Sequence, residues 1–203
     1  MADVVLFHHA QGLTDGVKAF ASELRDAGHT VHVPDLYSGH TFATLEEGMA
    51  YARQIDFEEI LDQGVAAGEA LGDGLVYAGF SLGVLPAQKL AQTVAGARGA
   101  LLFHSFIPVS EFSESWPEGV PVQVHAMDAD TLFVDDGDQD AARELVASTP
   151  EAELFLYPGD THLFVDSSLP DFEPTAAALL TRRVLDFLRE RDEESGATPG
   201  TSE

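Results

Sequence analysis

Short apolar segments alternate with segments of helical periodicity along most of the chain, and no other feature constrains the fold as strongly. Each apolar segment is short and nearly uninterrupted, as expected of a strand buried on both faces of a sheet. The predicted strands are residues 4–7, 30–33, 74–79, 100–103, 120–126 and 153–157. The predicted helices are residues 15–27, 44–53, 57–71, 82–94, 139–147 and 174–191. This order predicts an α/β fold, with helices on both faces of a mostly parallel sheet.

The length and composition fit a single domain over residues 1–191. The chain has 203 residues, of which 45% are hydrophobic, enough to bury a full core. Residues 192–203 are rich in acidic, Gly, Ser and Thr residues, and we expect them to form a disordered acidic tail. No apolar run reaches the length of about 18 residues that a membrane span needs, and no secretory signal pattern is present. We therefore expect a cytoplasmic location.

The net charge restricts the partners of the protein. Thirty-five acidic residues against ten basic residues give a formal net charge of −25. Such a surface repels phosphate backbones and anionic lipids, so neither nucleic acid nor a membrane is an expected partner. Two interpretations of the charge remain: the protein works in a salty cytoplasm that screens self-repulsion, or its genome encodes arginine-rich and acid-rich proteins without any adaptation to salt. The absence of cysteine excludes disulfides, a thiol nucleophile and thiolate metal ligands.

One motif indicates nucleophilic catalysis. Gly79-Phe80-Ser81-Leu82-Gly83 has the pattern G-x-S-x-G, with a predicted strand before it and a predicted helix after it. This context is that of a nucleophile elbow, in which a tight turn presents the serine hydroxyl at the end of the strand. The backbone N–H of Leu82 would then be free to stabilise an oxyanion. The alternative is an ordinary glycine-rich turn, and the flanking elements favour the elbow.

A serine hydroxyl needs a base, and an elbow of this kind is followed along the chain by an acid and then a histidine. His162 follows the last predicted strand, which places it at the same sheet edge as Ser81; the alternative is a surface loop histidine. The acid should follow the strand over residues 120–126, so Asp128 and Asp130 are the candidates. Its role would be to fix the imidazole tautomer and stabilise the imidazolium.

The remaining polar clusters do not indicate a metal or a cofactor. His8 and His9 are adjacent near a strand end, so their side chains point to opposite sides and one metal would not take both. The aspartates over residues 135–138 lack the ligand spacing of a calcium loop. A backbone N–H between His9 and Gln11 is a candidate second oxyanion donor. Four further histidines are expected to be structural and hydrogen-bonded: His29, His32, His104 and His125.

Together these motifs resemble the dienelactone hydrolase family of the α/β-hydrolase superfamily. The stretches that carry the resemblance are residues 8–12, 33–37, 79–83, 102–104, 127–130 and 158–162. The resemblance implies a single-domain α/β-hydrolase that needs neither cofactor nor metal, with the backbone N–H groups of Leu82 and Ala10 as the oxyanion hole. It also favours Asp130 over Asp128, because the family acid lies in a G-x-x-D-like stretch in which Met127 replaces the glycine.

Two departures from the family pattern concern the site. The founding members resemble cysteine hydrolases with a glutamate near the thiol, whereas Ser81 and His9 occupy these positions here. Ser81 must therefore depend on His162. Arginines grip the substrate carboxylate in those enzymes, and Arg53 is the nearest candidate in this chain. His9, Tyr37 and Phe164 are the candidate residues of the substrate pocket.

The favoured function is hydrolysis of small carboxylic esters, lactones or thioesters through a triad of Ser81, His162 and Asp130 and an acyl-enzyme. The expected partner is a small-molecule substrate, and the sequence does not indicate an oligomeric state. One alternative is a non-catalytic small-molecule-binding module on a hydrolase scaffold. Another is an acyltransferase or perhydrolase that uses the same acyl-enzyme.

Overall fold

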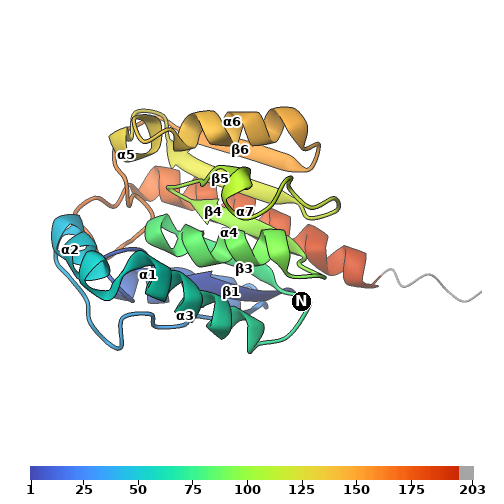
Figure 1. The fold of residues 1–203 in the computed structure, drawn as a ribbon, viewed down its shortest axis with the longest axis horizontal. Helices are drawn as coiled ribbons and strands as arrows, with labels where there is room; N and C mark the ends of the chain where they lie inside the picture. The colour runs from blue at the N-terminus through green and yellow to red at the C-terminus, as the bar shows by residue number, and fades with distance from the viewer. Residues whose placement is uncertain (197–203) are drawn as a thin grey trace, which may run out of the picture.

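The protein folds around one six-stranded sheet, in which all strands are parallel and follow the order β2-β1-β3-β4-β5-β6 (Figure 1). The computed structural model describes residues 1–196, with side chains described up to residue 193. The strands are β1 (Asp3–Phe7), β2 (Thr30–His32), β3 (Val76–Phe80), β4 (Gly99–Phe103), β5 (Val122–Met127) and β6 (Ala152–Tyr157). The helices are α1 (Asp15–Asp26), α2 (Leu45–Ile55), α3 (Phe57–Glu69), α4 (Val84–Thr93), α5 (Thr131–Val134), α6 (Asp138–Ser148) and α7 (Pro174–Gly196). The predicted parallel α/β architecture is confirmed.

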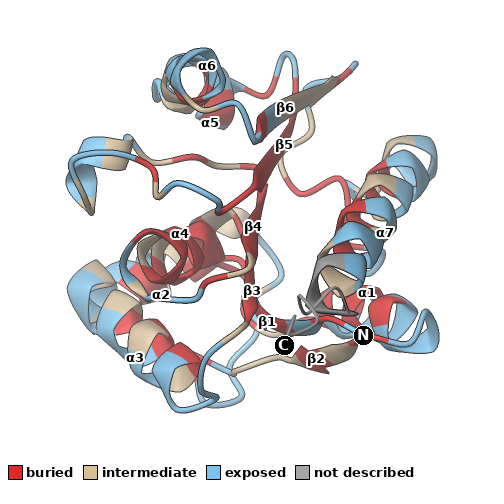
Figure 2. Ribbon diagram, turned by 90° about the vertical axis from the view of Figure 1, so that its right-hand side faces the viewer, coloured by how far each residue is buried: buried red, intermediate tan, exposed pale blue. Residues whose placement is uncertain are grey.

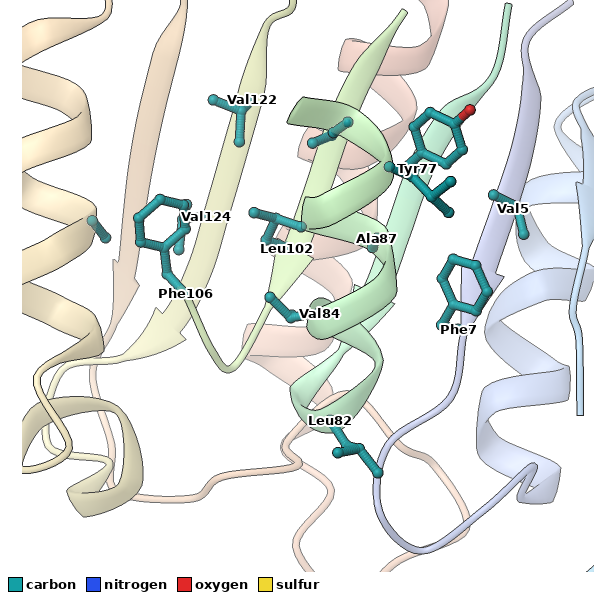
Figure 3. Packing of buried hydrophobic residues seen from close by; sticks show 14 of the residues in the cluster. Val5, Phe7, Tyr77, Leu82, Val84, Ala87, Leu102, Phe106, Val122 and Val124 are labelled. Carbon is teal, nitrogen blue, oxygen red and sulfur yellow. The ribbon is translucent and has the colours of Figure 1, made fainter. Parts of the chain in front are cut away.

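Each face of the sheet has its own apolar core, because successive side chains of a strand point to opposite faces. In β1, Val5 and Phe7 belong to one core, whereas Val4 and Leu6 belong to the other. Helices α1 and α7 cover one face, and α2, α3, α4 and α6 lie on the other (Figure 2). Helix α4 contacts β1, β3 and β4, and its buried side chains face the sheet (Figure 3). Burial of each such Val or Leu side chain contributes about 1.5–3 kcal/mol.

The strand order fixes where a ligand site can form. β1 pairs with β2 on one side and with β3 on the other, so the chain reverses its direction across the sheet at this point. In open parallel sheets, ligands bind at such a reversal, outside the carboxyl ends of the strands. The loop after β1 and the turn after β3 flank this crevice.

The C-terminal helix is longer than predicted. α7 extends to Gly196, so the expected disordered tail is wrong for residues 192–196. The Asp192 carboxylate lies 2.9 Å from the N-terminal ammonium of Met1, and the Arg98 guanidinium, which precedes β4, donates to the Arg191 carbonyl oxygen. These contacts hold the helix end against the domain, which composition alone does not reveal. Residues 197–203 of the predicted tail lie outside the described residues. Up to residue 196, no helix has the length and apolar character to cross a membrane.

Candidate active site

The G-x-S-x-G turn joins β3 to α4 through a single 3-10 turn over Ser81–Gly83. A Cβ atom on Gly79 would lie 2.1 Å from the carbonyl oxygen of Gly83, and one on Gly83 would lie 2.5 Å from that of Phe7. Both glycines are therefore required for space. The left-handed backbone falls instead on Ser81, whose φ is 49°. A non-glycine residue in this region is strained, and such strain concentrates at active sites.

Ser81, His162 and Asp130 form a continuous hydrogen-bonded chain. The Ser81 Oγ and His162 Nε2 atoms are 2.8 Å apart, and His162 Nδ1 lies 2.7 Å from Asp130 Oδ2. The carboxylate accepts from Nδ1–H, so Nε2 is left as an acceptor for the serine hydroxyl. Asp130 is buried, and its other oxygen accepts from the Leu132 N–H at the start of α5. Asp128 instead accepts from the Gly159 N–H, so the structure places Asp130 and not Asp128 at the histidine.

The loop after β1 is held rigidly beside the serine. The His8 Nδ1–H donates to the His9 carbonyl, while Nε2 accepts from the Leu36 N–H. Burial lowers the pKa of His8 to about 4, so its ring is neutral as these two bonds require. A Cβ atom on Gly48 of α2 would lie only 2.1 Å from the Ala10 carbonyl oxygen. The Ala10 N–H donates to no group within residues 1–196, so it is free to donate to an oxyanion.

A cavity of about 470 Å³ opens beside Ser81 and His162. Its volume lies in the range of about 300–1,000 Å³ that is typical of small-molecule sites. The Asp138 carboxylate in its wall accepts hydrogen bonds from the Ser105 hydroxyl and the Phe106 N–H, and burial raises the pKa of Asp138. The other wall residues come mainly from α2, α5 and the strand ends: Leu45, Glu46, Met49, Arg53, His104, Leu132 and Asp136.

The predicted pocket residues His9, Tyr37 and Phe164 do not line this cavity. The His9 ring is buried and its Nε2 contacts Asp166. Tyr37 packs edge-on against His8, and Phe164 packs edge-on against His104. These three rings belong to the core, so the prediction that they line the substrate pocket is wrong. Side chains from helices α2 and α5 form much of the pocket wall instead.

Sequence reasoning missed most of the cavity wall for a physical reason. A helical pattern predicts that residues 44–53 form a helix, but not that its Met49 side chain faces the site; Arg53, which does line the cavity, was named only through the family resemblance. Ser105 could have been predicted from the sequence, because it is the second residue after β4 and the carboxyl ends of parallel strands meet at one edge of the sheet. Asp166, four residues after His162, shows no spacing signal in the sequence.

His104 differs from the satisfied structural histidine that was expected. It is fully buried in the cavity wall, yet neither ring nitrogen has a hydrogen-bond partner among the described residues. Its φ is 69°, again in the left-handed region. Burial, and then the neighbouring His162 and His9, hold its pKa well below 6.5. The other three histidines do have partners: His125 bonds Tyr157, His32 bonds Asp3, and His29 accepts from the Ala2 N–H.

A parallel α/β sheet with a strained serine at a strand-to-helix turn, facing a histidine and an aspartate, defines the α/β-hydrolase class. The chain belongs to the dienelactone hydrolase family, whose sequence model matches residues 1–191. The family predicted from the motifs is thus confirmed.

Solved structures with the same fold include several hydrolases. A dienelactone hydrolase-like promiscuous phosphotriesterase from metagenomic libraries is 21% identical, with a TM-score of 0.71 over 94% of this chain and 86% of that one. A lipase in its open form is 15% identical, with a TM-score of 0.67 over 94% and 90%. The thioesterase domain from the curacin biosynthetic pathway is 14% identical, with a TM-score of 0.60 over 90% of both chains. At these identities the similarity shows the fold. No curated protein matches the chain.

Proposed function

We propose that the protein hydrolyses small carboxylic esters, lactones or thioesters through an acyl-enzyme on Ser81. The observation that carries this proposal is the chain of two short hydrogen bonds, 2.8 Å from Ser81 to His162 and 2.7 Å from His162 to Asp130. Nucleophile and base are therefore within proton-transfer distance, and the base is oriented by a buried acid. Membership of a hydrolase family supports the same reaction.

The proposed reaction proceeds in two halves. Ser81 Oγ bonds to the carbonyl carbon while its proton passes to His162 Nε2, and the carbonyl electron pair becomes an oxyanion held by the N–H groups of Leu82 and Ala10. The bond to the leaving oxygen or sulfur then breaks, and His162 gives its proton to that atom. Water attacks the acyl-enzyme and gives a proton to His162, which returns it to Ser81 as the acid leaves. No cofactor takes part in these steps.

The cavity wall disfavours anionic substrates. It carries three carboxylates, those of Glu46, Asp136 and Asp138, against the single guanidinium of Arg53. An anionic substrate would meet net negative charge here, in a chain whose total charge is −25. The apolar side chains of α2 and α5 would pack against a short acyl or alkyl group.

The decisive test compares the wild type with the folded Ser81→Ala variant. We expect the wild type to hydrolyse p-nitrophenyl acetate and butyrate, and the variant to lose about 10³-fold or more of this activity. Both proteins should be assayed in low and molar KCl, because an acidic protein can require salt to fold. A fluorophosphonate should label Ser81 covalently in the wild type.

The remaining outcomes separate the alternatives. Equal hydrolysis by two folded proteins, with no labelling of Ser81, would remove the serine mechanism and favour a non-catalytic binding module. Acyl transfer to an added alcohol or peroxide that exceeds hydrolysis would identify an acyltransferase or perhydrolase, because only the acceptor differs.

A further inference from the structure

A second histidine–aspartate pair lies behind the site, apart from the catalytic chain. His9 Nε2 is 2.8 Å from Asp166 Oδ2, and both side chains are buried. Asp166 also accepts from the Thr14 hydroxyl and from the backbone N–H and hydroxyl of Ser168, the latter two at 2.8 and 2.6 Å. The proposed reaction uses neither member of this pair.

The hydrogen bonds of His9 define a single tautomer. His9 Nδ1 accepts from the Gln11 N–H at 3.2 Å, so this nitrogen carries no proton. Nε2 must then be the N–H that donates to Asp166. Asp166 therefore keeps the proton of His9 on Nε2 and leaves Nδ1 free to accept from the Gln11 N–H. This hydrogen bond fixes the backbone turn that contains Ala10.

The surroundings of Asp166 keep it ionised. It lies at the N-terminus of α1, where a Cβ atom on Gly16 would come within 1.7 Å of its Oδ1 atom. A helix N-terminus favours an anion, and glycine there gives the carboxylate room to approach. The hydrogen bonds from His9, Ser168 and Thr14 outweigh burial and hold the pKa of Asp166 at about 2. A carboxylate so strongly held can act only as an acceptor at neutral pH.

The pair connects two loops, each of which contributes a group to the proposed active site. Asp166 lies on the same loop as His162, whereas His9 precedes Ala10 on the loop after β1. We propose that His9 and Asp166 are positioning residues that hold the Ala10 N–H in the oxyanion hole relative to His162. This inference rests on the proposed function, because it assigns a role in stabilising the tetrahedral oxyanion.

Two substitutions at one position separate the two bonds of His9. In His9→Asn the side-chain oxygen can take the place of Nδ1 and accept from Gln11, but no donor reaches Asp166. In His9→Gln the side-chain amide can take the place of Nε2–H and donate to Asp166, but Gln11 loses its acceptor. Asp166→Asn removes the carboxylate that selects the tautomer. His125→Gln is the matched control, because His125 is also a buried, hydrogen-bonded histidine but lies outside the site.

The measurements are kcat and KM for p-nitrophenyl butyrate, the active fraction by fluorophosphonate titration, and the inhibition constant of phenylboronic acid, whose adduct with serine mimics the tetrahedral intermediate. We expect His9→Asn, His9→Gln and Asp166→Asn to lower kcat per active site about 10–100-fold, with KM nearly unchanged. Boronate binding should weaken by a similar factor. His125→Gln should lower the melting temperature and leave kcat per active site and boronate binding as in the wild type.

A merely structural role gives a different pattern. If the three variants at the pair lower only the melting temperature and the active fraction, as His125→Gln does, the positioning role is refuted. If one variant at His9 retains full kcat, the two bonds do not act as a unit, and the inference also fails. A folded wild type that reacts with neither fluorophosphonate nor boronate would instead refute the proposed function itself.

Discussion

Replacement of Gly48 by alanine should greatly lower the activity of the protein, although Gly48 lies outside the proposed catalytic residues. Gly48 lies in α2, and an added Cβ atom would come 2.1 Å from the Ala10 carbonyl oxygen and 3.0 Å from the Gln11 nitrogen. Ordinary contact begins near 3.4 Å, so helix and loop must separate by about 1 Å. The neighbours are backbone atoms, which cannot rotate away as a side chain can.

Two opposing terms decide the stability of Gly48→Ala. Replacement of glycine by alanine inside a helix contributes about 1 kcal/mol of stability. Overpacking against a fixed backbone costs about 1–3 kcal/mol. The net loss is therefore about 0–2 kcal/mol, and the protein should fold. Activity should fall much further, because a displacement of about 1 Å at a reacting centre can reduce the rate about 10²-fold.

Gly68→Ala in α3 is the control for this prediction. Its added Cβ atom would approach Leu90 Cδ1 to 2.5 Å, at the far end of a flexible side chain remote from Ser81. We expect kcat of Gly68→Ala to equal that of the wild type, and kcat of Gly48→Ala to be about 10²-fold lower. Urea unfolding and esterase assays on the same preparations measure both effects. Wild-type kcat in folded Gly48→Ala would refute the idea that α2 places the Ala10 peptide for catalysis.

Three further predictions concern stability. Ser81→Gly should be about 1 kcal/mol more stable than Ser81→Ala in urea, because glycine relieves the left-handed backbone at this position; equal midpoints would show that Ser81 is not strained. Lowering the pH from 7.5 to 5.5 should reduce the unfolding free energy by about 4 kcal/mol, since His8, His104 and His125 stay neutral when folded but protonate near 6.5 when unfolded. Their contribution is complete above pH 6.5 and is lost as the pH falls toward their folded pKa values, so a flat profile from 7.5 to 5.5 would contradict it. Molar KCl should raise the melting temperature of a chain with a net charge of −25; a melting temperature that does not rise would reject the halophilic interpretation.

The fold was predictable because its signals are local. Apolar runs such as residues 4–7 read as buried strands wherever they occur, and the chain order of strands and helices then leaves few arrangements. Ser81 and His162 were predictable for the same reason, since Ser81 directly follows β3, His162 lies on the loop after β6, and parallel strands end at one edge. The choice between Asp128 and Asp130 was harder, because both follow β5 within one turn and only the backbone path decides which carboxylate meets the histidine.

Most residues of the pocket wall and the His9–Asp166 pair could not be predicted from residue spacing along the sequence. Which face of α2 meets the site follows from how that helix packs, so Met49 could not be chosen in advance, and Arg53 was named only through the family resemblance. His9 and Asp166 are 157 residues apart, and nothing near either one in the sequence indicates the other. His104 was expected to be hydrogen-bonded like the other structural histidines, and only the assembled structure shows that neither of its ring nitrogens has a partner among the described residues.

The position of β6 has a consequence for how activity arises during folding. β6 is an edge strand, paired only with β5, and the loop that follows it delivers His162. Ser81 is therefore synthesised 81 residues ahead of His162, its proposed base. A nascent chain that ends before β6 lacks His162, and so lacks the proton acceptor proposed for Ser81. Under the proposed mechanism, esterase activity therefore requires β6 to be docked on β5, and its recovery in a refolding experiment reports molecules in which this strand is in place.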